Sequence, residues 1–223
     1  MLTLVLAETE LERVPHEIAG HPQVRAAARA ANRNAPKMLL DGSLHHAAMR
    51  SLHDGDRRGR PDLVHQFLLT ALESRANKAG HLGVGIHTRN DEWITVDATT
   101  RLVRNYNRFC GLIEKLFEEG RVPQEPVLLE IHRGRALTTV IESLAPDRVL
   151  WLDETAPPSP SSSIFRSGDG EQHIVAIVGG FPHGGFRTQP PPGVERIGFG
   201  PTPLAVWTVA AELTVRYEDL VSG

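Results

Sequence analysis

Short apolar segments and longer amphipathic segments alternate along this chain. The short apolar runs predict β-strands at 2–7, 37–41, 84–87, 93–96, 127–131, 149–152, 174–178 and 197–199. Apolar residues spaced three or four apart predict helices at 23–33, 44–52, 62–72, 107–119, 136–144 and 203–217. Strands that alternate with helices indicate an α/β fold with a mostly parallel sheet flanked by helices. The length of 223 residues suits one elaborated domain, residues 1–223.

Residues typical of helix ends accompany several of these segments. Asp62 is placed to cap the helix 62–72, and Gly120 follows the helix 107–119 as a C-terminal glycine. Thr202 and Pro203 are a typical N-cap and first helical residue, so we expect the last helix to begin at Pro203. The charged segment 54–61 and the Pro/Ser-rich segment 156–163 predict loops.

Composition narrows the class of protein. Apolar residues make up 40% of the chain, enough for a sizeable core, and the one cysteine, Cys110, excludes an internal disulfide framework. The longest aliphatic run, 174–178, is too short to cross a bilayer, and no basic residues precede the apolar start of the chain as they do in a signal peptide. We therefore expect a soluble, intracellular protein without a membrane partner.

Charge is distributed unevenly along the chain. Lys and Arg number 24 against 27 Asp and Glu, for a formal net charge of −3. The segment 57–108 alone holds nine basic and five acidic residues, a net of +4, which leaves −7 for the remainder. A basic face on an acidic body fits a partner that carries phosphate groups. Because arginines outnumber lysines 21 to 3, a general arginine bias explains the excess equally well.

Two glycine-containing loops follow predicted strands near the C-terminal end. The strand 174–178 runs into GGFPHGG at 179–185, and the second loop has the sequence IGFGPTPL at 197–204. Glycines expose main-chain groups at the carboxyl edge of a sheet, where α/β proteins bind ligands. The chain lacks the dinucleotide fingerprint, the P-loop pattern and the GxSxG nucleophile motif. The loops predict a cleft for a small cofactor within about 149–217, with a plain surface loop as the alternative for 179–185.

Arginines recur in the segment TRLVRNYNR at 100–108. Three of them have the spacing of one side of a helix or helical turn: Arg101, Arg104 and Arg108. Tyr106 between them offers a stacking surface for an unpaired base. Earlier in the chain Arg60 lies two residues before Asp62, whose carboxylate is placed to orient the guanidinium. These residues predict phosphate contacts with RNA, the alternatives being a solvated face paired with distant acids and an incidental ion pair.

Histidines are numerous but poorly spaced for a metal. The chain has eleven, among them His45 and His46, which precede His53 and Asp54. Adjacent histidines on a helix point about 100° apart, and no HxH or HxxxH pair exists. We expect no metal site, and we expect His45 or His46 to form a hydrogen bond in a core or interface.

Seven motifs in collinear order between residues 39 and 217 resemble the ribosome-biogenesis pseudouridine methyltransferases of the SPOUT (α/β-knot) class. They are LLDGSLHHAAM (39–49), RGRPDLVH (58–65), NKAG (77–80), IHT (86–88), TRLVRNYNRFCG (100–111), VGGFPHG (178–184) and PLAVW (203–207). Each motif alone is common, and the ordered set is specific. The resemblance implies a SPOUT-type α/β knot, with a mostly parallel sheet flanked by helices and a trefoil-knotted cofactor site near the C-terminus.

The resemblance also implies a cofactor and partners. The cofactor is S-adenosyl-L-methionine, and the product is an N1-methylated pseudouridine at an unpaired loop position of small-subunit ribosomal RNA. The protein is expected to be a homodimer that works with ribosome assembly proteins in the cytoplasm, or in the nucleolus of a eukaryote. Matching positions assign RNA contacts within the basic segment 57–108 to Arg60, Arg101, Arg104 and Arg108. They assign cofactor binding to Leu152, Gly179, Gly184, Phe199, Gly200, Pro201, Thr202, Pro203 and Leu204.

The proposed chemistry needs alignment of the methyl donor with the ring nitrogen and loss of the N1 proton. Arg60 and Asp62 are the candidate catalytic residues, with Asp62 steadying Arg60. Asp62 and bulk water are both candidates for the base, and arginines beside the ring are a third means of lowering the barrier, by stabilising its developing anion. Two other functions stay open: an RNA-binding assembly factor whose catalysis is secondary or lost, and a SPOUT methyltransferase for another RNA nucleotide.

Overall fold

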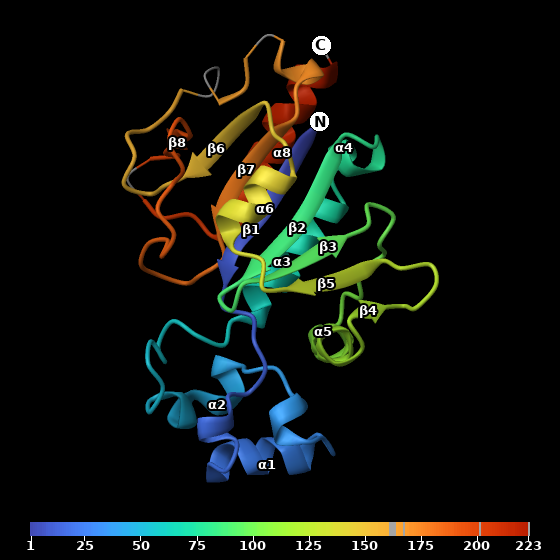
Figure 1. Ribbon diagram of the computed structural model, residues 1–223, viewed down its shortest axis with the longest axis vertical. Helices are drawn as coiled ribbons and strands as arrows, with labels where there is room; N and C mark the ends of the chain where they lie inside the picture. The colour runs from blue at the N-terminus through green and yellow to red at the C-terminus, as the bar shows by residue number, and fades with distance from the viewer. Residues whose placement is uncertain (161–163, 167, 201, 223) are drawn as a thin grey trace.

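The computed structural model describes residues 1–160, 164–166, 168–200 and 202–222. Within these residues eight strands form one sheet in the order β4-β5-β3-β2-β1-β7-β6-β8 (Figure 1). β2, β1, β7, β6 and β8 pair in parallel, and β3, β5 and β4 extend one edge with antiparallel pairs. The strands are β1 (Leu2–Thr9), β2 (Leu82–Thr88), β3 (Glu92–Val96), β4 (Arg121–Val122), β5 (Leu129–Arg133), β6 (Arg148–Leu152), β7 (Ile174–Gly179) and β8 (Glu195–Ile197).

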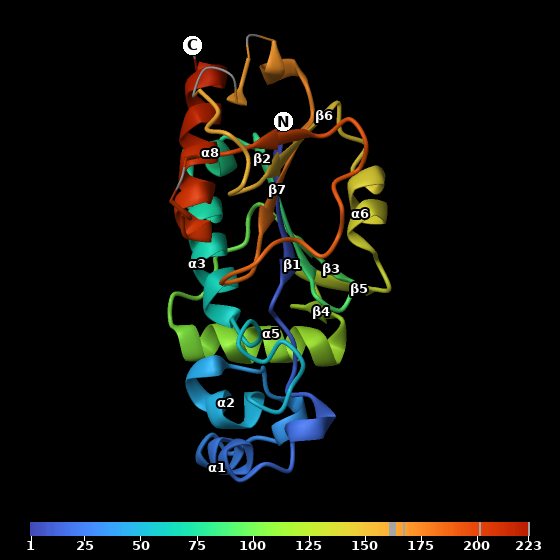
Figure 2. The same cartoon turned by 90° about the vertical axis from the view of Figure 1, so that its left-hand side faces the viewer.

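Helices cover both faces of the sheet. The α-helices are α1 (Pro22–Ala30), α2 (Gly42–Met49), α3 (Pro61–Leu72), α4 (Arg75–Lys78), α5 (Tyr106–Glu119), α6 (Leu137–Ser143) and α8 (Val206–Ser222). In Figure 2, α3 and α8 lie on one face of the sheet and α6 on the other, while α1 and α2 form a separate layer beyond α5. No helix in the described part of the chain is long and apolar enough to cross a bilayer.

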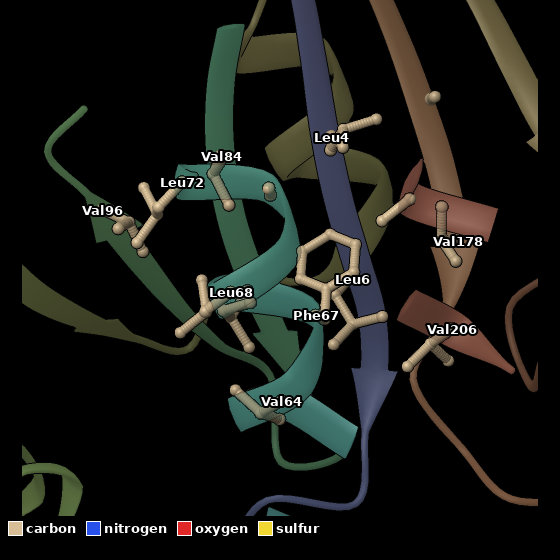
Figure 3. Packing of buried hydrophobic residues seen from close by; sticks show 14 of the residues in the cluster. Leu4, Leu6, Val64, Phe67, Leu68, Leu72, Val84, Val96, Val178 and Val206 are labelled. Atoms are coloured by element: carbon tan, nitrogen blue, oxygen red, sulfur yellow. The ribbon is translucent and has the colours of Figure 1, made fainter. Parts of the chain in front are cut away.

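Both faces of β1 are buried. All eight residues of β1 are buried. Because side chains alternate along a strand, Leu4 and Leu6 join the cluster under α3 and α8, whereas Val5 joins the cluster under α6. Figure 3 shows Phe67 of α3 projecting onto β1 beside Leu6. A central strand covered on both faces is typical of a parallel α/β sheet, so the predicted layer arrangement is confirmed.

The predicted strand 37–41 is wrong. The structure has a short 3-10 helix at Ala35–Lys37, followed by a single β-bridge between Leu39 and Arg13. Met38 and Leu40 are buried, but they pack with Val24 in the small cluster of the α1–α2 layer instead of pairing with the sheet. A short apolar run shows that residues are buried without showing which kind of element buries them.

Candidate active site

A cavity of about 500 Å³ opens at the carboxyl ends of β6, β7 and β8. Three segments that follow these strands form most of its wall: residues 153–155, residues 181–190, and residues 199–200 with 202–204. A pocket of this size is within the range of about 300–1,000 Å³ that holds a small organic ligand. Its position at the carboxyl edge of a parallel sheet is where α/β proteins bind nucleotides and other cofactors.

Close contact between strands explains the paired glycines after β7. Gly180 donates its N–H to the Ala7 carbonyl at 2.8 Å. This hydrogen bond holds Gly180 close to the end of β1. A Cβ atom added at Gly180 would lie 2.9 Å from the Cα of Thr9. At Gly179 it would lie 2.6 Å from the Phe181 ring, which lines the cavity. A side chain at position 180 would therefore collide with the main chain of Thr9, whereas at position 179 the obstacle is the ring of Phe181.

Eight of the nine residues predicted to bind the cofactor lie in the cavity wall. They are Leu152, Gly179, Gly184, Phe199, Gly200, Thr202, Pro203 and Leu204. The ninth, Pro201, lies outside the described residues. The predicted helix start is wrong, because α8 begins at Val206, so Thr202 does not cap it and Pro203 is not its first residue. Both residues belong to the loop 199–204 instead.

Arg60 and Asp62 form a two-point ion pair at the start of α3. The guanidinium donates Nε to Oδ1 at 2.8 Å and Nη2 to Oδ2 at 2.7 Å. Arg60 occupies the N-cap position and Pro61 begins the helix, so the prediction that Asp62 caps α3 is wrong. The hydrogen bond to Asp62 raises the pKa of Arg60 above its ordinary value. Asp62 thus holds a permanently charged guanidinium at a fixed orientation.

The other three predicted arginines lie on the surface beside α3. Arg101 and Arg104 belong to the loop that precedes α5, and only Arg108 is helical, so the expected common helical side is absent. The His65 ring of α3 hydrogen-bonds the Val103 carbonyl at 2.9 Å, which anchors this loop. All three side chains are exposed, and within the described residues none forms an ion pair or hydrogen bond.

Two residues near these arginines, Glu73 and Tyr106, have partners of their own. Glu73, the acid whose pKa Arg101 and Arg104 help to lower, is bound mainly by Lys78 at 2.9 Å. Tyr106 directs its hydroxyl to Asp41 at 2.6 Å, and its ring contacts His65. Burial and the bond to Asp41 raise the pKa of Tyr106 well above its ordinary value. The three exposed guanidinium groups of Arg101, Arg104 and Arg108 are therefore not neutralised by an ion pair within the described residues.

Other arginines of the segment 57–108 are used inside the protein. Arg57, Arg58 and Arg89 pair with carboxylates that follow the core of β1, chiefly Glu10 and Glu12. The net charge of +4 therefore does not form one continuous basic face. His45 is fully buried and its Nδ1 accepts the Asp41 N–H at 3.1 Å, as expected for a core histidine.

One residue connects the cavity to Arg60. Glu10 donates its N–H to the Gly180 carbonyl at 3.2 Å, and its own carbonyl accepts the Arg60 N–H at 2.9 Å. Gly180 lies between two residues that line the cavity, Gly179 and Phe181. Two hydrogen bonds through Glu10 therefore link the main chain of Arg60 to Gly180. The cavity and the Arg60–Asp62 pair therefore lie at the same edge of the sheet.

Comparison with known proteins decides the family. Residues 4–218 match the EMG1/NEP1 methyltransferase family model. The chain is 47% identical to the Ribosomal RNA small subunit methyltransferase Nep1 of Thermococcus kodakarensis, over 98% of both proteins. It is 46% identical to the protein of the same name from Methanothrix thermoacetophila, over 99% of this chain and 97% of that protein. The chain belongs to the EMG1/NEP1 methyltransferase family.

The fold agrees with a solved structure of an EMG1/NEP1 protein. The crystal structure of Archaeoglobus fulgidus Nep1 bound to S-adenosylhomocysteine matches this chain with a TM-score of 0.87 and 35% identity, over 99% of both chains. The expected SPOUT-type α/β knot is thereby confirmed. Rules for ordinary folds do not predict such a knot, because threaded chains are nearly absent from them.

The loop after β6 falls within the predicted cofactor region 149–217, but none of its residues was singled out from the sequence. Asp153 accepts hydrogen bonds from Thr155 at 2.7 Å and from Arg196 Nε at 2.9 Å, and all three residues line the cavity. Burial acts to raise the pKa of Asp153, but these hydrogen bonds outweigh it and leave the pKa below its ordinary value. Its position in the sequence could have identified Asp153 as a pocket residue, because it directly follows β6, which is parallel to β7 and ends at the same edge of the sheet.

Proposed function

We propose that this protein transfers a methyl group from S-adenosylmethionine to N1 of a pseudouridine in small-subunit ribosomal RNA. The observation that carries the proposal is the junction at Glu10, whose main chain is hydrogen-bonded both to Gly180, beside the glycine-walled cavity, and to Arg60. Residues 149–217 form the cofactor region and arginines within 57–108 contact RNA, in one domain of 223 residues. We place the protein in the cytoplasm, where it acts on ribosomal subunits together with assembly proteins.

The cavity suits the methyl donor in size and chemistry. Leu152, Gly179 and Gly184 would contact it at the strand ends, and the loop 199–204 would enclose it. Main-chain groups exposed by the glycines offer donors and acceptors for an adenine edge. S-adenosylmethionine supplies an electrophilic methyl group on a sulfonium centre.

Arg60 supplies the electrostatic part of the chemistry. As the N1 proton leaves, negative charge spreads over the uracil-like ring, and a fixed guanidinium beside the ring stabilises that charge. Both Asp62 oxygens accept hydrogen bonds from Arg60, so we assign Asp62 to holding the guanidinium and leave the N1 proton to water. Arg101, Arg104 and Arg108 bind phosphates of the loop that presents the unstacked base.

An assay with two versions of one RNA hairpin tests the substrate. The hairpin carries either uridine or pseudouridine at the target position, and transfer from methyl-labelled S-adenosylmethionine is measured for each. We expect transfer to the pseudouridine form alone. Transfer to the uridine form would reassign the enzyme to another nucleotide. Tight binding of the hairpin with no transfer to either form would favour an assembly factor.

The exposed face of α8 supports a homodimer. Trp207 and Val215 lie eight residues apart on one side of the helix and are 39% and 51% exposed. Leu204, 42% exposed, continues this apolar surface onto the loop that lines the cavity. A second copy of the chain that covers these residues would also close one side of the pocket. We propose this surface as the dimer interface.

Charge placed on this surface tests the dimer. Val215→Glu is expected to convert the protein to a monomer in light scattering coupled to gel filtration, because a carboxylate buried in an apolar interface is costly. Leu44→Glu is the matched control, since Leu44 is exposed to a similar degree (47%) on α2 and should leave the dimer intact. A dimeric Val215→Glu variant would place the interface elsewhere.

A further inference from the structure

Three acidic residues at and just beyond the carboxyl end of β1 are almost completely buried. Glu8, Glu10 and Glu12 are 4%, 0% and 3% exposed. Buried carboxylates are costly unless cations and hydrogen bonds compensate for the lost water. Four arginines do so here: Arg57, Arg58, Arg89 and Arg187. The proposed chemistry of Arg60 and the cavity uses none of these ion pairs directly.

Glu10 holds the centre of this network. Its Oε1 accepts a hydrogen bond from Arg57 Nε at 2.7 Å and lies 3.6 Å from Arg187 Nη2. Its Oε2 accepts a hydrogen bond from Arg89. These contacts add to the main-chain hydrogen bonds that join Glu10 to Gly180 and to Arg60. Glu10 is thus bound at once to the strand end beside the cavity, to the segment before α3 and to the end of β2.

Arg57 extends the network into the pocket wall. Its Nη1 donates to the Gly185 carbonyl at 2.8 Å, and its guanidinium carbon lies 4.0 Å from the centre of the Phe181 ring. Both Phe181 and Gly185 line the cavity. A guanidinium can hydrogen-bond in its plane and stack on an aromatic ring at the same time, which a lysine cannot do.

The far end of the same loop is held by Glu8. Its two carboxylate oxygens accept the N–H groups of Arg187 and Thr188, each at 2.7 Å. The Arg187 side chain continues to Asp54, at 2.9 Å, in the segment that leads to Arg57. The loop 181–188, which we name the pocket loop, is therefore fixed at both ends to the residues that precede Arg60.

We infer that Glu10, acting through Arg57, is a positioning residue that sets the pocket loop and the Arg60 segment in one mutual arrangement. The inference rests on the proposed function, since it concerns the alignment of methyl donor and target base. Glu10 touches neither of them. Methyl transfer depends steeply on the alignment of donor and acceptor, and a misplacement of 1 Å costs about 100-fold in rate.

Glu10→Gln with Glu12→Gln as its matched control tests the inference. Glu12 follows the same strand, is also buried and pairs bidentately with Arg58 at 2.7 Å; it lies 3.8 Å from Arg89 but forms no hydrogen bond or ion pair with the described residues of the pocket loop. Calorimetry with S-adenosylhomocysteine measures the affinity of the pocket for the cofactor product. The rate of methyl transfer to the pseudouridine hairpin at saturating cofactor reports how well donor and acceptor are aligned. For Glu10→Gln we expect affinity to fall about tenfold and the saturated rate about 100-fold. For Glu12→Gln we expect less than a twofold change in either quantity.

A purely structural role predicts a different result. Both substitutions remove a buried charge, so both are expected to lower the melting temperature, and equal losses of affinity and rate in the two variants would overturn the inference. Wild-type affinity and rate in Glu10→Gln would overturn it as well. If wild-type protein binds S-adenosylhomocysteine but methylates no hairpin, the proposed function fails, while the affinity comparison still decides whether Glu10 shapes the pocket.

Arg57→Lys gives a second test if Glu10→Gln does not fold. The lysine keeps the charge beside Glu10 but loses the simultaneous hydrogen bond to Gly185 and the stacking on Phe181. We expect it to reproduce the loss of cofactor affinity and saturated rate with a smaller change in melting temperature. Wild-type affinity and rate in this variant would contradict the role of Arg57.

Discussion

Gly198→Ala is expected to abolish binding of S-adenosylhomocysteine and to lower the free energy of unfolding by about 3 kcal/mol. Gly198 is buried directly after β8, where it packs against the main chain of residues 156–157. An added Cβ would lie 2.3 Å from the Ala156 carbonyl oxygen and 2.7 Å from that of Pro157. Both obstacles are main-chain atoms, so no side chain can rotate to make room. Residues 156–157 must therefore shift away from the end of β8, next to the loops that line the cavity.

Calorimetry and denaturant unfolding measure the two effects of Gly198→Ala. Gly20→Ala is the control for the glycine-to-alanine change itself, because nothing lies within 4 Å of a Cβ added at Gly20. We expect the control to bind and unfold like the wild type. Retained binding by Gly198→Ala would mean that the loop 153–159 adapts at little cost, and that the pocket does not depend on this contact.

The layers of the fold could be predicted because burial leaves a local pattern. β1 is buried along its whole length and β7 along all but its last residue, and most of these buried residues are apolar. The helix 107–119 shows the same relation, since its apolar residues at helical spacing are buried in α5. The segment 37–41 was assigned wrongly because Met38 and Leu40 are buried against α1 and α2, while Leu39 joins the main core, and the local sequence does not reveal this division.

The sequence did not predict which arginines are buried in ion pairs inside the protein and which are exposed. Arg57 and Arg60 lie three residues apart in one charged loop, yet Arg57 is buried on Glu10 and Arg60 is part-exposed on Asp62. Only the second pair is local, and the first joins residues 47 positions apart. Spacing also suggested a common helical side for Arg101, Arg104 and Arg108, but the hydrogen bond between His65 and Val103 anchors a loop there.

Arg60→Ala is expected to lower kcat/KM for methylation of the pseudouridine hairpin by about 100-fold to 1,000-fold, which is the usual cost of removing one donor that stabilises developing charge. Affinity for S-adenosylhomocysteine should stay within about twofold, because the Arg60 side chain contacts Asp62 and not the cavity wall. The main-chain hydrogen bond from Arg60 to Glu10 is kept in the variant. The result therefore reports the guanidinium alone.

Asp62→Ala separates the position of this guanidinium from its charge. The arginine stays but loses both hydrogen bonds that fix it, so we expect a smaller loss of about tenfold in kcat/KM, measured in the same assay. Arg121→Ala is the matched control for both variants, and its kcat/KM should equal that of the wild type. Arg121 is an exposed arginine on the distant strand β4, and it pairs with Glu130 at 3.1 Å. A loss in Asp62→Ala as large as in Arg60→Ala would instead assign the carboxylate a part in removing the N1 proton, and the rate of that variant would then rise with pH as solvent hydroxide replaced the base.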